Sequence, residues 1–430
     1  MKRTNAPRAG FSADTQILTR RGWAALGDLD GRDELATLTG DERFEWQQLA
    51  ERHLFPFDGE MVEFRGRAVD LLVTPDYRIL TRRRKLKRQR EAGTHTSGHD
   101  WHFREAAYFV KCPGAVFEVL TSSHWTGLRP AEFIIPGHEA GRRHPAWEEA
   151  TEWLAGRLTA EWTPSADLKA EARGLGISRH ALQAARRNLG VSSRRRAAWW
   201  ETSRPTRRHI PVSGAYQPAP ELRIPMKDFC AFLGLYVAEG WVRKDRNDIL
   251  IAQAPTSRHL PEIRKILDAT GLWWSYDGKN GKFTASHKGL RAWLHENCGY
   301  RAWNKRVPDG FKDHSPDLLE VMLRGMMIGD GFWAPAGQRR YPTTSSRLAD
   351  DVQEIFQKTG RDARVYPLDL RKYPATMAAR PSFVVLERQR GLPLLPRPAL
   401  REHHGLAGGV TVPNGVVYAR RNGIAIWATA

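Results

Sequence analysis

The stretch FLGLYVAEG at residues 232–240 decides the fold of this chain, because its pattern returns as LRGMMIGDG at residues 323–331. Each copy has glycine at its third position, an acid at its eighth and glycine at its ninth. The stretch from about 225 to 395 is therefore predicted to be a duplicated fold unit. Apolar residues and a glycine also recur downstream at similar distances: Ile263, Ile266, Leu267 and Gly271 after the first copy, and Val352, Ile355, Phe356 and Gly360 after the second.

Both motifs predict an apolar helix with a face of small residues. Gly234 and Ala238 lie four positions apart in the first copy, as do Gly325 and Gly329 in the second. Residues four apart share one face of a helix, and small residues on that face let two helix backbones approach closely. We therefore expect the two motif helices to pack against each other.

The acid near the end of each motif predicts a metal site. Packed helices would bring Glu239 and Asp330 side by side, and two carboxylates that close repel unless cations lie between them. Oxygen ligands favour Mg²⁺, and two or more divalent ions between carboxylates can activate water and stabilise the leaving oxygen of a phosphodiester. The alternative is a pair of core helices, each ending in an acid before a glycine cap. The matching downstream spacing argues against that alternative.

Composition and charge favour a polyanionic partner. The chain has 67 Lys and Arg residues against 48 Asp and Glu, a formal charge of +19, and a pI of about 10.1. Such a surplus favours nucleic acid, whose phosphates basic side chains neutralise; a basic surface without a specific partner is the alternative. The 430 residues exceed one hydrophobic core, so several domains are expected, and 41% hydrophobic residues suffice for packed cores.

The cysteines and the chain start predict a cytoplasmic protein. The three cysteines, Cys112, Cys230 and Cys298, form no CxxC pair, so neither a disulfide framework nor a cysteine zinc site is expected. This usage suits a reducing compartment. The start MKRTNAPRAG has no apolar core, and no stretch has the length and hydropathy of a membrane span.

The segments on either side of the repeats read as β-structure. Residues 10 to about 135 alternate between apolar and polar over short runs separated by turn residues. The tail after Pro396 contains Pro-Asn-Gly and Arg-Asn-Gly turns between apolar runs, which indicates hairpins. The basic run at 82–90 is expected to be a loop that also touches phosphate.

A helical insert is predicted between the first β segment and the repeats. Helix LKAEARGLG, a glycine turn and basic helix SRHALQAARRNLG make a helix-turn-helix candidate, and VSSRRRAAWWETSR is short enough for a wing. Residues 203–220, rich in Pro and Ser, are a predicted linker. If the insert reads DNA, the base-contacting candidates are Arg179, His180, Gln183, Arg186 and Arg187, and the phosphate-contacting candidates are Arg194, Arg195 and Arg196. Packing alone is the alternative role for such a helix pair.

The repeated motif resembles that of the LAGLIDADG homing endonucleases in their two-motif, single-chain form, over about 225–395. The resemblance implies strands that lie along the DNA major groove, a central helix seam, and metal binding by Glu239 and Asp330. NKRVP at residues 304–308 looks like the Lys-x-Ile/Val-Pro element of that family. Its lysine, Lys305, is implied to position the attacking water or to stabilise developing charge; a surface lysine is the alternative.

The flanks resemble the Hint fold of self-splicing inteins, in residues 11–19, 66–80 and 416–430. The resemblance places Gly10 where a Cys or Ser nucleophile is needed. Tyr77 stands where a His follows the block containing Thr74, and the chain ends in Thr429-Ala430 where a terminal Asn is needed. Each chemical step of splicing thus lacks its reacting group. The residues were either engineered away or lost by natural decay, and decay is slightly favoured.

The chain is therefore predicted to be a monomeric, Mg²⁺-dependent endonuclease that cuts a specific double-stranded DNA site. The alternatives are a splicing-competent intein mutated for study and a DNA-binding protein without catalysis. The insert resembles winged-helix modules of some phage helicase-primase ATPases. The expected fold class is multidomain: an all-β Hint domain in two parts (10–135 and 400–430), a helix-turn-helix or winged-helix insert (145–205), and an α+β LAGLIDADG endonuclease (221–395) of two pseudo-symmetric αββαββα repeats (about 225–310 and 318–395).

Overall fold

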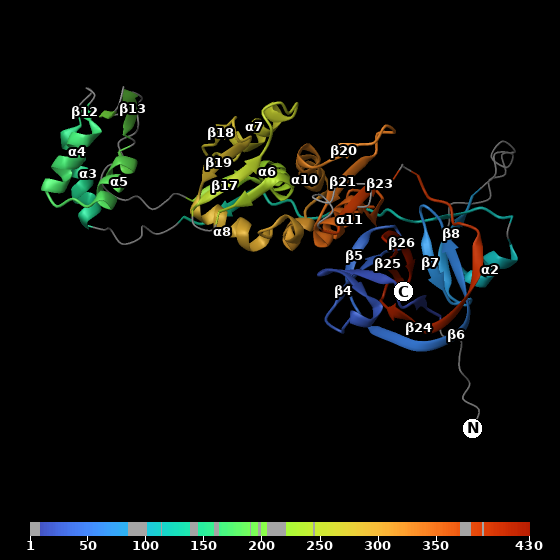
Figure 1. Cartoon of the computed structure of the whole chain (residues 1–430). Helices are drawn as coiled ribbons and strands as arrows, with labels where there is room; N and C mark the ends of the chain where they lie inside the picture. Colours follow the sequence, from blue (N-terminus) through green and yellow to red (C-terminus); the bar gives the residue numbers. More distant parts are fainter. Residues whose placement is uncertain are drawn as a thin grey trace. The chain divides into compact units, whose positions relative to one another are not determined.

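The structure is a computed structural model of the chain (Figure 1). It describes residues 9–84, 101–112, 114–137, 145–158, 163–189, 191–196, 199–203, 221–243, 246–369, 380–388 and 391–430. The predictions for residues 85–90 of the basic run and 204–220 of the linker lie outside the described residues. Helices and several β-sheets occur together, so the chain is mixed α and β. Within the described ranges, no helix is long and apolar enough to cross a membrane.

Two compact units make up the chain. The larger unit joins Met1–Phe133 to Ile224–Ala430, and the smaller unit is Ile134–Arg223. The larger unit contains both a β-rich part, called the β frame below, and a part with two repeats. Because these two parts belong to one compact unit, contacts between them contribute to a single folded body.

The β frame is built from both ends of the chain. β24 pairs with β6 along its whole length, from Pro398 opposite Phe64 to Thr411 opposite Glu51, and β1, β24, β6 and β7 close a barrel. The N-terminal strands are β1 (Phe11–Ser12), β2 (Gln16–Thr19), β3 (Gly22–Ala25), β4 (Glu34–Leu38), β5 (Phe44–Gln48), β6 (Glu51–Arg65), β7 (Asp70–Val73), β8 (Arg78–Arg83), β9 (His102–Glu105) and β10 (Phe117–Val119), with η1 (Leu26–Asp28) and α2 (Ala106–Lys111). The C-terminal strands are β24 (Pro398–Thr411), β25 (Val416–Arg421) and β26 (Ile424–Thr429).

Local sequence explains the last hairpin of the β frame. Asn422 and Gly423 join β25 to β26 with φ of 50° and 75°. Two successive positive φ angles define the hairpin turn that the Asn-Gly pair favours. The apolar residues of β25 and β26 are buried, so this hairpin lies in the core of the frame.

The repeat part contains the same strand order twice. The sheets are β16-β17-β19-β18 and β20-β21-β23-β22. The first repeat has α6 (Met226–Glu239), β16 (Gly240–Val242), β17 (Asp248–Ala252), α7 (Leu260–Asp268), β18 (Ser275–Asp277), β19 (Lys282–Ser286), α8 (Lys288–Asn297), η2 (Ala302–Asn304) and α9 (Asp309–Lys312). The second has α10 (Pro316–Gly329), β20 (Phe332–Trp333), β21 (Arg339–Thr343), α11 (Ser346–Lys358), β22 (Ala363–Pro367) and β23 (Phe383–Glu387).

One predicted helix is missing from the second repeat. The first repeat follows the expected αββαββα order, with α8 as its final helix. After β23, by contrast, the described residues 388 and 391–397 contain no helix and lead into β24. Pro393 and Pro396 explain the difference, because proline removes a helical hydrogen bond and clashes with the preceding turn. The prediction of a final helix in the second repeat was therefore wrong for these residues.

The sheet of the second repeat continues into the β frame. β22 pairs with β26 through Arg364 opposite Ile424, which joins the two parts in a ten-stranded sheet. The backbone N–H of Val365 donates to the carbonyl oxygen of Gly423 at 2.9 Å, and the Gln353 amide donates to the same oxygen at 3.0 Å. A Cβ on Gly423 would lie 1.8 Å from the Val365 oxygen, so only glycine fits this contact.

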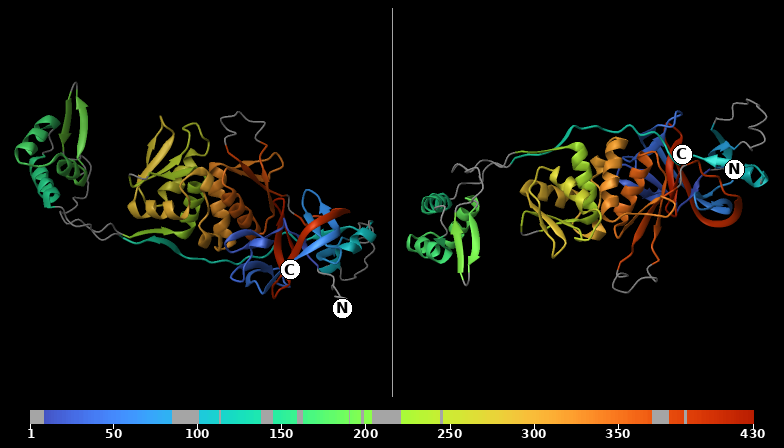
Figure 2. Two further views of the ribbon diagram at one scale, coloured as in Figure 1. Left: turned by 60° about the horizontal axis from the view of Figure 1, so that its bottom comes forward. Right: turned by 90° about the horizontal axis from the view of Figure 1, so that it is seen from above.

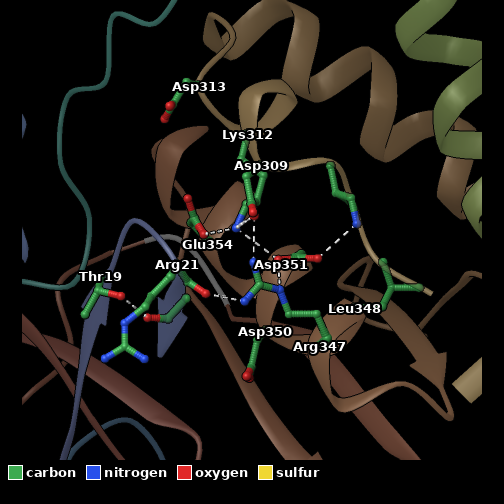
Figure 3. Close-up of polar contacts among 12 residues, drawn as sticks. Thr19, Arg21, Asp309, Lys312, Asp313, Arg347, Leu348, Asp350, Asp351 and Glu354 are labelled. Carbon is green, nitrogen blue, oxygen red and sulfur yellow. Dashed lines mark hydrogen bonds and ion pairs between the residues drawn. The ribbon is translucent and has the colours of Figure 1, made fainter. Parts of the chain in front are cut away.

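A buried ionic cluster lies in the repeat part, and Figure 3 shows its residue Lys312 beside Asp351 and Glu354. Lys312 Nζ lies 3.0 Å from Asp351 Oδ1 and 2.9 Å from Glu354 Oε2. Lys358 Nζ lies 2.8 Å from Glu354 Oε1 and 2.9 Å from Asp313 Oδ1. All but Asp313 are buried. The Lys358 ammonium also lies 4.5–5.4 Å from the ring centres of Phe44 and Trp46 in β5 and of Trp125, which follows β10.

Arg347 extends the cluster to the surface of the β frame. Its guanidinium donates to the Arg21 carbonyl and lies 2.6 Å from Asp309. It also pairs with Asp351, one turn along α11, at 3.2 Å. The ion pairs of Arg347 thus lie within the repeat part, and its hydrogen bond to the Arg21 carbonyl links α11 to the β frame.

In its described residues, the smaller unit contains three helices and a small sheet, β12-β14-β13. Its core consists of apolar side chains from all three helices, including Leu154, Leu168 and Leu182. Ser178 Oγ accepts a hydrogen bond from the Ala181 N–H at 3.1 Å, which caps the third helix. The elements are α3 (Pro145–Arg157), β12 (Thr163–Pro164), α4 (Ser165–Gly174), α5 (Arg179–Asn188), β13 (Ser192–Arg196) and β14 (Trp199–Ser203), and β11 (Glu132–Ile135) pairs with β15 (Leu222–Pro225) where the chain enters and leaves.

Candidate functional site

Helices α6 and α10 pack backbone to backbone along their glycines (Figure 2). A Cβ on Gly234 would lie 2.0 Å from the Met322 carbonyl oxygen, and a Cβ on Gly325 would lie 2.4 Å from the Ala231 carbonyl oxygen. Real Cβ atoms do not approach backbone atoms this closely, so both positions require glycine. We call this contact the helix seam.

The helix seam ends at the two motif acids. Glu239 is the last residue of α6, and Asp330 directly follows α10. A Cβ on Gly329 would lie 2.9 Å from Cγ of Glu239, so the Glu239 side chain lies against the backbone next to Asp330. Glu239 is half-buried, whereas Asp330 is exposed. The close approach of the helices therefore holds two carboxylates together at one end of the seam.

The surroundings of these acids disfavour two negative charges. Burial raises the pKa of Glu239 above its usual range. Desolvation of its carboxyl by neighbouring protein atoms and, secondarily, the Glu239 charge raise the pKa of Asp330 to about 7, although Lys305 opposes the shift. A carboxylate that loses water and gains a like-charged neighbour binds protons or cations more strongly. The pair thus has the electrostatics of a cation site.

Lys305 lies at the same end of α6. Its Nζ donates to the carbonyl oxygens of Gly240 at 2.7 Å and Tyr236 at 3.2 Å, and it lies 4.0 Å from the centre of the Tyr236 ring. Burial lowers the pKa of Lys305 to about 8, against the opposing influence of Cys298 and Asp330. The side chain is only 4% exposed, so the surface-lysine alternative was wrong.

The second repeat holds the loop that carries Lys305. The Lys305 carbonyl accepts a hydrogen bond from Ser345 Oγ at 2.6 Å. Two residues later, the Val307 N–H donates to Asp351 Oδ2 at 2.9 Å. Ser345 also caps α11, because its hydroxyl accepts from the Leu348 N–H at 3.1 Å. The lysine is thus attached to one repeat by its ammonium and to the other by its backbone.

The acids provide part of a metal site. No group of three or more His, Cys, Asp or Glu residues that could hold a metal occurs within the described ranges. Mg²⁺ keeps several waters and is commonly bound by one or two carboxylates together with phosphates of the substrate. Two neighbouring carboxylates with raised pKa values fit that ligand set, with the remaining oxygens supplied by water and a phosphate.

The positions compared above with the splicing blocks lie together in the β frame. The Gly10 N–H donates to Thr74 Oγ1 at 3.0 Å, and the Thr74 N–H donates back to the Gly10 carbonyl at 2.9 Å. The Tyr77 hydroxyl donates to the Thr429 carbonyl, and burial raises the pKa of Tyr77 well above its usual range although this bond opposes the shift. The Ala430 N–H donates to the Gly415 carbonyl at 3.0 Å.

Position 10 has no room for a side chain. A Cβ on Gly10 would lie 2.7 Å from the carbonyl oxygen of Gly408 and 2.9 Å from its nitrogen. These are backbone atoms of β24, which is held by β6 along its length. A nucleophilic side chain at this position would require the strand to move.

The predicted DNA-contacting residues of the insert lie on α5 and β13. Arg179, His180 and Gln183 are exposed on α5, while Arg186 is half-buried and its pKa is lowered by burial. The side chains of four others lie outside what the structure describes, although their backbone is assigned: Arg187 in α5 and Arg194, Arg195 and Arg196 in β13.

The buried ionic cluster and Tyr341 were missed by the sequence analysis. Lys312, Asp351, Glu354 and Lys358 occur in stretches whose charge is typical of solvated helix faces, and their burial depends on strands far away in sequence. Tyr341 is buried in β21 and lies within electrostatic reach of both motif acids. Its position after the second motif was the one available signal.

Comparisons with curated proteins give partial matches. No protein-family profile matches the chain. A DNA polymerase of Thermococcus aggregans is 27% identical over 188 residues, which cover 42% of this chain and 10% of the polymerase. A DNA polymerase of Thermococcus hydrothermalis is 30% identical over 142 residues, covering 32% and 8%. An uncharacterized protein of Methanocaldococcus jannaschii is 26% identical over 157 residues, covering 32% and 17%. The matches thus span less than a fifth of these relatives.

Solved structures give similarities of low TM-score. A chain of I-DmoI, solved in complex with DNA and Mn, has 11% identity and a TM-score of 0.28, and the alignment covers 38% of this chain and 90% of that chain. A splice-inactive variant of the AceL NrdHF class 3 split intein has 16% identity and a TM-score of 0.21, covering 27% and 66%.

Proposed function

We propose that this chain is a site-specific, double-stranded DNA endonuclease of the LAGLIDADG type. The observation that carries the proposal is the helix seam, whose glycines bring Glu239 and Asp330 together at one end of two repeats. Two repeats with one strand order supply a pseudo-symmetric pair of sheets, which suits a duplex with two strands to cut. The formal charge of +19 supports a polyanionic substrate.

Glu239 and Asp330 would hold two or more divalent cations, with Mg²⁺ as the expected ion. When bound, the cations supply charge stabilisation to a scissile phosphate. The protein's own contribution is to hold the two carboxylates at a fixed separation and partly away from water. Lys305 adds a buried positive charge within reach of Asp330 and so favours charge developing on the phosphate oxygens.

The β frame is proposed to be a Hint-type scaffold that does not splice. Gly10 lacks a nucleophile, and β24 blocks the space that its side chain would need. The Tyr77 hydroxyl is occupied by the Thr429 carbonyl and is too buried to ionise readily. Neither residue can start an acyl shift. The alternative of a splicing-competent intein mutated at its ends is disfavoured because Tyr77 departs within the frame as well.

The insert is proposed to be a winged-helix module that extends the DNA contact. Its exposed Arg179, His180 and Gln183 share the basic helix α5, and such side chains at a helix start can reach base edges in a major groove. The hairpin of β13 and β14 carries Arg194–Arg196 along one strand, a suitable arrangement for phosphate contacts.

Cleavage of DNA tests the proposal directly. The full chain is incubated with Mg²⁺ and a supercoiled plasmid. The plasmid carries the host gene's uninterrupted insertion site, that is, the gene sequence without the inserted element. The protein without substitutions is expected to cut the plasmid to linear DNA. Glu239→Gln and Asp330→Asn are expected to abolish this cleavage. Asp268→Asn, which changes an exposed carboxylate at the end of α7, is the matched control and should cut normally.

Binding without cleavage would instead favour a non-catalytic DNA-binding protein. A gel-shift assay in Ca²⁺ separates the two outcomes, because Glu239→Gln and Asp330→Asn should still bind the DNA. Cutting that survives both seam substitutions would refute the assignment of Glu239 and Asp330. Retention of two carboxylates where phosphate must lie argues against the pure binder, since the acids alone would repel the DNA backbone.

A further inference from the structure

Tyr341 buries a hydroxyl group that has no hydrogen-bond partner. Among the described residues, the tyrosines whose buried hydroxyls lack a partner are Tyr236, Tyr341 and Tyr418. Tyr341 is only 1% exposed. An unpartnered buried hydroxyl is unfavourable for folding, and each such group calls for an explanation.

Strand register brings Tyr341 to the motif acid of the second repeat. In the β20–β21 hairpin, Phe332 lies opposite Arg340. Continuing this antiparallel register by one residue in each strand brings Tyr341 toward Gly331, directly after Asp330. Tyr341 therefore stands at the root of the hairpin, next to the end of the helix seam.

Tyr341 faces the helices rather than the outer side of the sheet. Alternate residues of a strand share a face, so Tyr341 shares its face with Arg339. Arg339 lies 4.8 Å from the centre of the Phe356 ring of α11 and bonds Glu320 of α10 at 2.7 Å. Helix α10, whose end carries Asp330, thus lies on the side to which the Tyr341 ring points.

The electrostatic neighbours of Tyr341 differ from those of the other two tyrosines. Burial raises the pKa of Tyr341, and Asp330 and Glu239 raise it further. The neighbour that raises the pKa of Tyr236 beyond burial is Cys298. Burial also raises the pKa of Tyr418, and two arginines, Arg388 and Arg420, oppose that rise. Of these three tyrosines, Tyr341 is the one whose pKa both motif acids raise.

The two repeats differ at this position. In the first repeat, the register pairs Gly240 with Ile251, whose side chain has no donor. The polar group there is the Lys305 ammonium, which bonds the Gly240 carbonyl at 2.7 Å. Asp330 therefore has two polar neighbours, the Lys305 charge that comes from the first repeat and the Tyr341 hydroxyl on the hairpin of its own repeat.

We propose that Tyr341 is a positioning residue for Asp330, donating its hydroxyl hydrogen to the carboxylate when Asp330 binds a divalent cation. This inference rests on the proposed function. A hydrogen bond from a neighbouring residue to a metal-binding carboxylate fixes its orientation, and loss of such a bond typically weakens metal binding about 10–100-fold. The bond takes one oxygen of Asp330 and leaves the other for the cation.

Mn²⁺ binding to the full chain, followed by electron paramagnetic resonance, tests the proposal. Natural protein, Tyr341→Phe, Asp330→Asn and Tyr418→Phe are compared, and each titration is normalised to the folded fraction from circular dichroism. Tyr341→Phe is expected to weaken Mn²⁺ binding about 10–100-fold without lowering Tm, because the hydroxyl has no partner to lose. Tyr418→Phe removes an equally buried hydroxyl from the β frame and should leave Mn²⁺ binding unchanged.

Each outcome distinguishes the inference from the proposed function. Mn²⁺ binding that Asp330→Asn abolishes but Tyr341→Phe leaves within twofold would overturn the role of Tyr341 alone. Equal weakening by Tyr341→Phe and Tyr418→Phe would overturn it as well, because the effect would then be general to buried tyrosines. No binding by the natural protein, or binding insensitive to Asp330→Asn, would refute the cation site and the proposal built on it.

Discussion

Substituting alanine for Gly325 should separate the two motif helices and thereby stop cleavage. The added Cβ would lie 2.4 Å from the Ala231 carbonyl oxygen and 2.9 Å from the Leu235 nitrogen. Both are backbone atoms of α6, so no side chain can rotate to relieve the contact. Reaching an ordinary contact of about 3.4 Å requires roughly 1 Å of helix displacement at the oxygen.

The magnitude follows from two opposing effects. Overpacking in a tight core costs about 1–3 kcal/mol, whereas replacing glycine within a helix stabilises by about 1 kcal/mol. The net loss of folding free energy is therefore about 0–2 kcal/mol, toward the upper end because the blocked atoms are backbone. A displacement of about 1 Å at the reacting groups costs on the order of 100-fold in rate.

The assay combines urea unfolding, followed by circular dichroism, with single-turnover cleavage of plasmid DNA. Gly156→Ala is the matched control, because Gly156 is exposed in α3 and a Cβ there meets nothing within 4 Å. The control substitution should raise the free energy of unfolding by about 1 kcal/mol. It should cut DNA at the rate of the protein without substitutions. If Gly325→Ala cuts within twofold of the natural protein, the seam does not set the carboxylate geometry and the reasoning is wrong.

Four further predictions concern Lys305, the buried cluster and the β frame. Lys305→Met should slow single-turnover cleavage about 100–1,000-fold with DNA binding in Ca²⁺ retained; an unchanged rate would remove Lys305 from the site. Lys358→Met should lower the unfolding free energy in urea by about 3–5 kcal/mol, because it leaves buried Glu354 with one cation fewer; a loss under 1 kcal/mol would contradict this. Burial would raise the pKa of Glu354, but Lys358 and Lys312 lower it to about 2. Its contribution to stability is therefore complete above the unfolded pKa of about 4.3, and urea midpoints should fall as pH drops from 5 toward 2, less steeply in Glu354→Gln. Gly10→Cys should show no peptide-bond cleavage at residue 10 by mass spectrometry. Release of an N-terminal peptide would instead show that β24 moves to make room for the side chain.

The repeat architecture could be read from the sequence because each step was local. Glycines four residues apart in both motifs predicted one close helix face, and Gly234 and Gly325 do contact the opposite backbone. The Asn-Gly pair at 422–423 predicted its hairpin because few residues accept two successive positive φ angles. In these elements, residue type and spacing determine the backbone without reference to distant parts.

The contacts between the β frame and the second repeat could not be read in this way. Lys312 is buried against Asp351 and Glu354 of α11, and Lys358 is buried against the rings of Phe44 and Trp46, so each depends on residues distant in sequence. Charged residues in a helix usually face water, so pattern alone assigns them to the surface. The hydroxyl of Tyr341 was hidden for the same reason, since its neighbours are set by pairing of β20 with β21.

If the β frame is the non-splicing scaffold proposed above, these contacts give a reason why it would persist. Without β26, strand β22 would present an open edge, and such edges promote aggregation. Without the rings of the frame, the Lys358 ammonium would lose its aromatic cover, and α11 would lose the Arg347 bond to the Arg21 carbonyl. Helix α11 supports Ser345, which holds the loop of Lys305. On the proposed function, selection for cleavage alone would therefore retain the frame, because its strands complete the sheet of the second repeat.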